Sequence, residues 1–174
     1  MTDRRSFMTA MALGAVGGAA LGAAPAFAQQ RRDTPGVEFE FEAHVLLDPG
    51  VEIGETSMGG RRRIPIIGGT FEGERIKGKV IPGGMDWQLI RGDGVTEVEA
   101  DYMIQADDGA MIHVYNHGII VPGKDGAPPY IRTSPQFEAP IGPHDWLNKT
   151  VFLGTIGGGG PGPASVRIGV WRVT

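Results

Sequence analysis

Beyond residue 36 the chain is a series of short apolar runs between turn residues, and some runs alternate between apolar and polar positions, a period of two that is typical of strands rather than helices. The alternation is strict in Val37–Glu42, where apolar and acidic residues take turns, which predicts a half-buried strand. Turn residues separate the remaining apolar runs. Further strands are predicted at Val51–Ile53, Arg63–Ile67, Arg75–Ile81, Met85–Arg91, Thr96–Ala106, Ala110–Val121, Tyr130–Phe137, Thr150–Ile156 and Ser165–Val173.

Thr96–Ala106 is the one ambiguous segment, because part of its apolar pattern also fits a helical face. Asp93-Gly94 and Asp108-Gly109 bracket it, and Asp-Gly is a strong hairpin signal. Its even-numbered positions also alternate cleanly with the polar ones. We therefore predict a strand.

The count of nine to ten short strands predicts an all-β protein, either a sandwich or a barrel. We expect a single-domain antiparallel β-barrel, because closure removes the exposed edges that would pair with other chains. Of the 29 glycines, the 25 that follow residue 28 suit the corners and bulges of a strongly curved sheet. Pro143–Asn148 is expected to form one helical turn, and Ile156–Pro163 a flexible loop between the last two strands.

The first 28 residues have the pattern of a twin-arginine export signal. Arg4-Arg5 precedes an apolar stretch from Met8 to Leu21, and the small-x-small sequence 26–28 predicts cleavage after Ala28. The stretch is too short for a stable transmembrane anchor, which needs roughly 20 apolar residues. We expect a signal peptide at 1–28, a flexible segment at 29–36 and the barrel at 37–174. The expected location is periplasmic or secreted, with the twin-arginine export machinery as a partner.

The composition excludes several kinds of site and partner. The chain has no cysteine, which excludes disulfides and thiolate metal sites, and no nucleotide-binding loop is evident, so no cofactor is expected. A net charge of −4 argues against nucleic acid as a partner. Arg61-Arg62-Arg63 is interpreted as a solvated strand start or a local anion site.

The four histidines do not predict a metal site. His113 and His117 would share a strand face but stand about 13 Å apart, too far to chelate one zinc ion. A site would need ligands from different strands, so no metal ligand is assigned.

Polar residues are densest between Asp86 and Asn148. Asp86 and Gln88 flank Trp87, so they should point to the face opposite the indole. If such residues meet inside the barrel, they could perform acid–base chemistry on a small molecule. The candidate catalytic residues are Asp86, Asp101, His113 and Tyr115. The candidate substrate-binding residues are Arg132 for a carboxylate, Asn148 and Gln88 as polar contacts, and Trp87, Phe137 and Trp146 as apolar walls.

Several spaced blocks, in order, resemble the domain-of-unknown-function 3237 family, also called uncharacterised protein family 0311. They are Gly68–Gly73, Gly78, Pro82–Gln88, Asp108–Ala110, Asn116–Gly118, Tyr130–Arg132, Pro135–Glu138 and Trp146–Asn148. The resemblance runs from about Glu38 to the C-terminus. It implies a compact β-barrel and, through some similar proteins, cofactor-independent lyase chemistry on small aromatic compounds.

Three functions stay open at this point. The first is a cofactor-free lyase, isomerase or hydratase acting on a small aromatic or carboxylated molecule. The second is a non-catalytic carrier or sensor with a lipocalin-like pocket, and the third is a structural protein with a packed interior. The oligomeric state, including a homo-oligomer, is not determined by the sequence.

Overall fold

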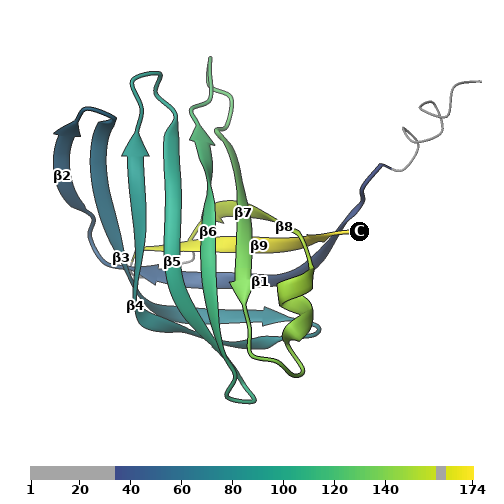
Figure 1. Ribbon diagram of the computed structural model, residues 1–174. Coiled ribbons are helices and arrows are strands. Elements are labelled where there is room, and N and C mark those ends of the chain that lie inside the picture. The colour runs from purple at the N-terminus through teal and green to yellow at the C-terminus, as the bar shows by residue number, and fades with distance from the viewer. Residues whose placement is uncertain (1–33, 160–163) are drawn as a thin grey trace, which may run out of the picture. The chain divides into compact units, whose positions relative to one another are not determined.

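The alternating segments form nine strands and one short 3₁₀ helix in the computed structural model, which describes residues 34–159 and 164–174 (Figure 1). The predicted signal peptide, its cleavage site at Ala28 and most of the segment 29–36 lie outside these residues. The strands are β1 (Val37–Leu47), β2 (Val51–Thr56), β3 (Gly59–Gly73), β4 (Lys77–Ile90), β5 (Thr96–Ala106), β6 (Met111–Val121), β7 (Tyr130–Glu138), β8 (Phe152–Gly158) and β9 (Ser165–Val173). The helix η1 spans Asp145–Lys149.

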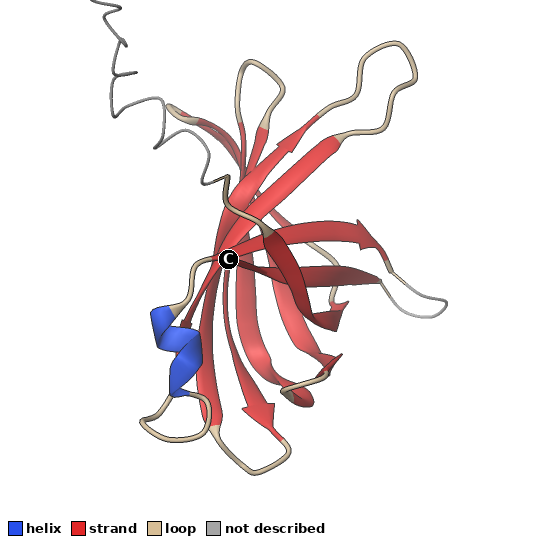
Figure 2. Cartoon of the chain, turned by 90° about the vertical axis from the view of Figure 1, so that its right-hand side faces the viewer, coloured by secondary structure: helices blue, strands red, loops and turns tan. Residues whose placement is uncertain are grey.

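Eight of the strands close into an antiparallel barrel. Their order is β1-β9-β8-β7-β6-β5-β4-β3, and β1 pairs with β3 to complete the ring. The ninth strand, β2, pairs with β3 and extends the sheet beyond the closed ring. Figure 2 shows the strands wrapping around a common interior. The predicted all-β barrel is therefore confirmed.

Two predicted strands prove to be one. The predicted strands Arg75–Ile81 and Met85–Arg91 are the two halves of β4, which begins at Lys77 and ends at Ile90. It continues through Pro82-Gly83-Gly84 as a bulge between Ile81 and Met85. Gly83 adopts a φ of 110°, which a residue with a side chain rarely adopts. The Pro-Gly-Gly sequence thus bends the strand without ending it, because both neighbouring strands continue past it.

The ambiguous segment Thr96–Ala106 is strand β5 over its whole length. Its flanking Asp-Gly pairs lie in turns, which are closed by hydrogen bonds from Gly94 N to Arg91 O and from Gly109 N to Ala106 O. The expected helical turn is also present, as η1. The expected loop Ile156–Pro163 is corrected, since β8 runs to Gly158.

The strict alternation at the start of β1 does not persist in the structure. A register shift between Phe39 and Phe41 turns Phe39 outward, 52% exposed, and buries the carboxylate of Glu40. Arg172 Nε lies 2.8 Å from Glu40 Oε1, and Arg75 Nε lies 3.6 Å from its other oxygen. The buried charge is tolerated because it is paired with two guanidinium groups.

One end of the barrel interior is filled by aromatic side chains. Phe137 packs against Phe41 and Phe152, with ring centroids 5.9 and 5.0 Å apart, and Trp146 of η1 lies 6.1 Å from Phe152. Leu147 of the same helix is fully buried. The open volume of the interior is therefore left toward the other end.

Within residues 34–159 and 164–174, no helix has the length and apolar character that a membrane crossing requires.

Candidate functional site

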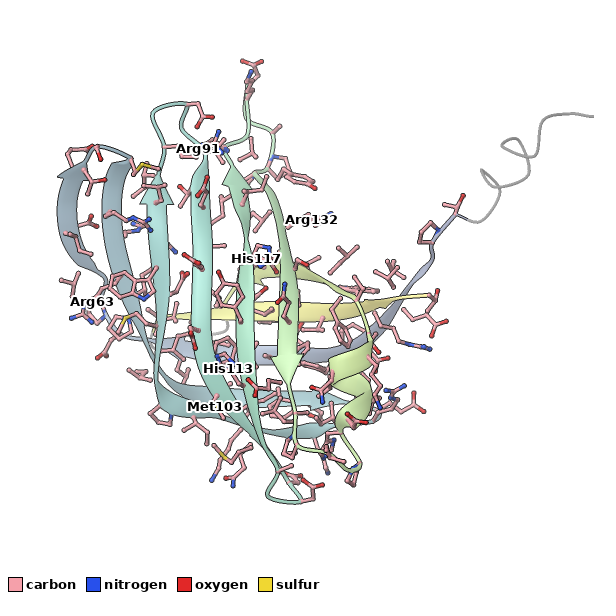
Figure 3. The ribbon with its side chains drawn as sticks, in the orientation of Figure 1. Arg63, Arg91, Met103, His113, His117 and Arg132 are labelled. Carbon is pink, nitrogen blue, oxygen red and sulfur yellow. The ribbon has the colours of Figure 1, made fainter. Side chains whose placement is uncertain are left out.

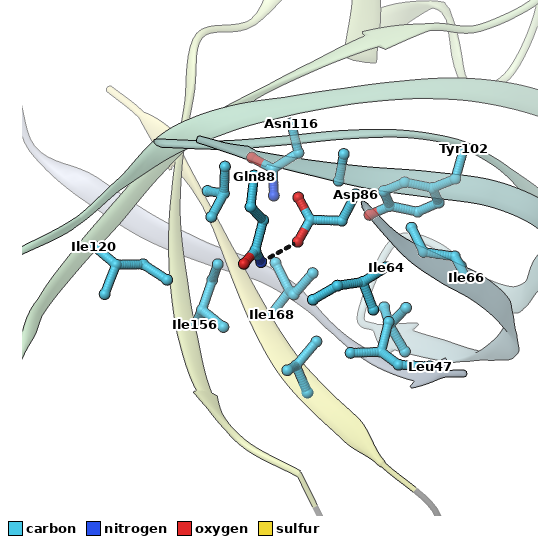
Figure 4. A pocket seen from close by; sticks show the side chains of 14 residues that line it. Leu47, Ile64, Ile66, Asp86, Gln88, Tyr102, Asn116, Ile120, Ile156 and Ile168 are labelled. Atoms are coloured by element: carbon cyan, nitrogen blue, oxygen red, sulfur yellow. Dashed lines mark hydrogen bonds between the residues drawn. The ribbon is translucent and has the colours of Figure 1, made fainter. Parts of the chain in front are cut away.

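An interior cavity of about 130 Å³ lies between the strands of the barrel (Figure 4). An engineered apolar cavity of roughly 150 Å³ can hold a benzene molecule, so the space suits a single ring. Most of its wall is aliphatic, and the polar exceptions are Asp86, Gln88, Tyr102 and Asn116. The aliphatic lining consists of Val45, Leu47, Ile64, Ile66, Val98, Ala100, Ile120, Ile156, Val166 and Ile168.

Asp86 and Gln88 enter the cavity from β4, on the face opposite the Trp87 indole. Trp87 between them points outward and is 40% exposed. The Gln88 amide donates to Asp86 Oδ2 over 2.6 Å, and the backbone N–H of Glu99 donates to Asp86 Oδ1 over 3.2 Å. Each carboxylate oxygen of Asp86 is therefore held by one protein donor.

Arg62 determines which way the Gln88 amide faces. Its Nε donates to Gln88 Oε1 over 2.7 Å, from the position directly opposite on β3. With the oxygen of the amide occupied, the NH₂ group must face Asp86. Of the two interpretations of the arginine run, neither a solvated strand start nor an anion site describes Arg62. It orients a polar chain in the barrel wall.

Burial raises the pKa of the Asp86 carboxyl above its ordinary value. The hydrogen bonds from Gln88 and Glu99 and the charge of Arg62 act in the opposite direction but do not cancel the loss of solvation. A carboxyl group with a raised pKa holds its proton more readily than an exposed one, which suits a group that accepts a proton and returns it.

Tyr102 and Asn116 complete the polar part of the cavity. Burial raises the pKa of the Tyr102 phenol, which keeps it protonated and able to donate. Asn116 is 2% exposed, and its Oδ1 has no hydrogen-bond partner among the residues the structure describes.

A glycine makes room for Tyr102. A Cβ atom on Gly84 would lie 2.3 Å from the Tyr102 Cβ and 2.9 Å from the Asp101 carbonyl oxygen. No ordinary contact is that short, so a side chain at residue 84 would displace the tyrosine or the β4 bulge. The bulge of β4 thus helps to position a cavity residue.

The candidate catalytic residues Asp101, His113 and Tyr115 lie on the outer face of the barrel. Figure 3 labels His113 on this face. His113 Nε2 is 2.8 Å from Asp101 Oδ1, and the Tyr115 hydroxyl donates to Glu99. His113 and Asp101 contact each other, and Tyr115 stands opposite Asp101 on the paired strand. All three lie outside the barrel rather than in the cavity with Asp86. The reason is strand parity: Tyr102 on β5 and the buried residues of β6 point inward, so their neighbours point outward.

Arg132 is also on the outer face and does not reach the cavity. Its guanidinium donates to the carbonyl of Ile131 over 2.7 Å and lies 5.2 Å from the Tyr130 ring. Trp87 borders a shallow outer depression together with Tyr115 and His117. Neither residue can contact a molecule held inside the barrel in this structure.

The remaining candidates lie at the closed end of the barrel. Asn148 accepts a hydrogen bond from Ala139 N over 2.7 Å and donates to Ala139 O over 2.9 Å, so it ties η1 to the end of β7. The guanidinium carbon of Arg75 lies over the Trp146 ring, 3.6 Å from the ring centroid. With Phe137 they form a structural plug and do not line the cavity.

Sequence reasoning missed Tyr102, Asn116 and Arg62 as site residues. The signal for the first two was present: each is a polar residue at an inward position of an otherwise apolar alternation. Arg62 could be placed only from the β3–β4 register.

No cluster of three or more histidine, aspartate, glutamate or cysteine side chains suited to a metal ion occurs among the described residues.

Comparison with known proteins identifies relatives over nearly the whole barrel. Residues 35–173 match the family described as "Protein of unknown function (DUF3237)". A UPF0311 protein of Rhodopseudomonas palustris is 41% identical over 114 residues, covering 59% of this chain and 74% of that protein. The crystal structure of a conserved protein of unknown function from the same species has a TM-score of 0.73 at 33% identity. It covers 81% of this chain and 99% of the other.

One relative carries a named activity. The hydroalkoxylation enzyme phnH of Penicillium herquei is 28% identical over 125 residues, which cover 72% of this chain and 76% of that protein.

Proposed function

Since the chain belongs to the DUF3237 family, we propose that its barrel is a cofactor-independent enzyme of the lyase, isomerase or hydratase type. Asp86 is the group that moves a proton, and the substrate is a small, ring-sized molecule held in the interior cavity. Gln88, Tyr102 and Asn116 provide the polar contacts.

The observation that carries this proposal is the position of one carboxyl group. Asp86 is the acidic residue of a cavity that is otherwise mostly aliphatic, and its pKa is raised by that burial. Small-molecule sites are commonly apolar with a few placed polar groups, and perturbed carboxyl groups are common among catalytic acids and bases. Because Gln88 and Glu99 hold both oxygens, the carboxyl has a defined orientation toward the cavity.

The relative with a named activity supports the same class of chemistry. Hydroalkoxylation adds the oxygen and the hydrogen of an O–H bond to the two carbons of a double bond. A proton must therefore leave the hydroxyl group, and a proton must be delivered to carbon. A single carboxyl with a raised pKa can do both in turn.

The first test asks whether proton transfer depends on Asp86. The mature protein is incubated in D₂O with a panel of single-ring alkenes, enols, phenols and hydroxy acids, and deuterium uptake into carbon is followed by mass spectrometry. We expect protein-dependent uptake with some of the compounds and a loss of about 100-fold or more in Asp86→Asn, the usual range for a general acid–base group.

Asp107→Asn is the matched control, because it makes the same substitution at a carboxylate exposed on the surface. Uptake that persists in Asp86→Asn would overturn the assignment of Asp86, and so would an equal loss of uptake in Asp107→Asn.

A carrier that binds a small molecule without changing it is the second candidate. The observation that favours it is the largely aliphatic wall of the cavity. The carrier predicts that ring compounds stabilise wild type and Asp86→Asn equally against heat and that neither protein catalyses deuterium uptake.

The compartment is proposed from the sequence. The Arg4-Arg5 pattern and the site after Ala28 support export by the twin-arginine route and a periplasmic location for the mature barrel. Cell fractionation with Arg4→Lys/Arg5→Lys as the control tests this, since the variant should stay in the cytoplasm uncleaved.

A further inference from the structure

The polar groups of the cavity differ in what they can offer a ligand. The hydrogen bonds within the site run from Arg62 through Gln88 to Asp86, with Glu99 as a second donor to Asp86. That chain leaves the Tyr102 hydroxyl and the Asn116 amide nitrogen for a ligand. Figure 4 shows both directed into the space that the Asp86 carboxyl also faces.

A ligand in this cavity must match two hydrogen-bond donors, Tyr102 and Asn116, and one group that transfers a proton, Asp86. The Tyr102 phenol stays protonated because it is buried, so it donates to an oxygen more readily than it accepts a proton. The Asn116 amide nitrogen can only donate. A ligand oxygen without a proton of its own, such as a carbonyl oxygen, satisfies both groups.

Charge argues against a carboxylate in the cavity. Among the described residues that line it, none is basic, and Arg62 outside it already donates through Nε to Gln88. A carboxylate ligand would be placed beside Asp86, whose own ionised form is poorly solvated. Arg132, the residue predicted to hold such a group, lies on the outer face.

We propose that the cavity selects neutral ring compounds with a carbonyl group conjugated to a carbon–carbon double bond, with the carbonyl oxygen bound by Tyr102 and Asn116. This inference rests on the proposed role of Asp86 and names the substrate class of the same site. The reaction is the reversible addition of an O–H group across the conjugated double bond.

The steps balance without a cofactor. The ionised Asp86 takes the proton of the attacking hydroxyl or water while the oxygen of that attacking group forms a bond to the β-carbon. The π electrons of the double bond move through the α-carbon to the carbonyl oxygen, and the resulting enolate is stabilised by the two donors. Asp86 then returns the proton to the α-carbon, the carbonyl re-forms, and no oxidation or reduction occurs. The reverse sequence is an elimination.

A protonated carboxyl and a tyrosine are known to share the stabilisation of an enolate oxygen in another enzyme class. Here the described residues place an amide and a phenol in that role, while the carboxyl transfers the proton.

The test compares two ring compounds of nearly the same size: cyclohex-2-enone, which has a carbonyl, and cyclohex-2-en-1-ol, which has a hydroxyl at the same carbon. Affinities are measured by NMR titration of the mature protein, with the enone labelled with ¹³C at its carbonyl. We expect the enone to bind about 5–10-fold more tightly and its carbonyl resonance to move downfield on binding.

Tyr102→Phe and Asn116→Leu keep the size of the side chains while removing one donor each. Each variant should lower the affinity for the enone about 5–10-fold and reduce the carbonyl shift, with little effect on the alcohol. Tyr115→Phe is the matched control, because it removes a hydroxyl from the outer face of the neighbouring strand. Far-UV circular dichroism and a thermal melt establish that each variant is folded.

Equal or tighter binding of the alcohol, or a carbonyl shift that survives in both variants, would overturn the substrate class. If deuterium uptake still depends on Asp86 in that case, the proposed function stands and only this inference fails. If neither ring binds and no compound takes up deuterium, both fail together.

Discussion

Asp86 is the residue on which the proposed function depends most, and its surroundings give it a measurable signature. It is an acid moved out of water into an aliphatic wall, yet hydrogen-bonded at both oxygens. The pKa of Asp86 is about 3.9 in an unfolded chain and higher in the folded protein. At pH values between these two pKa values, the native state holds more protons than the unfolded state. Stability therefore falls as the pH rises through that window.

We predict that this loss of stability with rising pH is smaller in Asp86→Asn than in wild type. The measurement is the free energy of unfolding in urea at a series of pH values, and the slope is compared rather than the absolute stability. The slope is the relevant quantity because the amide that replaces the Asp86 carboxyl must place an NH₂ group against either the Gln88 amide or the Glu99 N–H, which lowers the absolute stability at every pH.

Asp108 provides a control, because its pKa is shifted in the direction opposite to that of Asp86. A hydrogen bond from the Ala110 N–H and another from His144 lower the pKa of its carboxyl. It stabilises the fold above the unfolded pKa, and that contribution is lost as the pH falls through the folded value. Asp108→Asn should therefore flatten the acid side of the curve, and the same slope change in both variants would contradict the assignment.

At the scale of single elements, η1 is a short segment that closes one end of the barrel. Asn148 satisfies both backbone groups of the buried residue Ala139 at the end of β7. The sequence suggested Asn148 as a substrate contact, but these bonds make it a tie between two elements. Removing the amide would leave a buried N–H and a buried C=O without partners.

Asn148→Ala should lower the free energy of unfolding by about 1–3 kcal/mol, measured by urea unfolding with tryptophan fluorescence. Lys149→Ala is the neighbouring control, since its ion pair with Asp145 lies on the surface and should leave the midpoint close to wild type. An Asn148→Ala protein as stable as wild type would show that the tie contributes nothing.

The strands themselves were largely predictable because their signals are local. Alternation and Asp-Gly pairs located β5 to the residue. The position of Trp87 between Asp86 and Gln88 indicated which residues of β4 share a face. The bulges of β1 and β4 were not predictable, because a bulge depends on the neighbouring strands. In β4, for example, Pro82-Gly83-Gly84 has the sequence of a turn unless both neighbouring strands are known to continue.

The site was predictable only in part for a related reason. Grouping Asp86 with His113 and Tyr115 by chemistry ignored the parity of β6, whose apolar residues Ile112 and Val114 point inward. Parity would have selected Asn116 and excluded the histidine. The contact between Arg62 and Gln88 depends on strand register, which no local pattern encodes.

At the scale of the whole molecule, the barrel combines a filled end with an open one. Aromatic rings and η1 occupy one end, and the cavity lies among the aliphatic residues beyond them. Closure through the β1–β3 pairing holds eight strands in register around that space. The central claim is that this interior, rather than the polar cluster outside it, receives the small molecule.

Isoleucine methyl groups distinguish the two surfaces directly. The cavity is lined by Ile64, Ile66, Ile120, Ile156 and Ile168. The exposed isoleucines are Ile53, Ile67, Ile119 and Ile141.

The most direct test is a methyl NMR titration of isoleucine-labelled mature protein with cyclohex-2-enone. We predict saturable chemical-shift changes at the five cavity isoleucines and none at the four exposed ones. Shifts confined to Ile119 and its exposed counterparts, or no saturable shift at the cavity residues, would contradict an interior binding site.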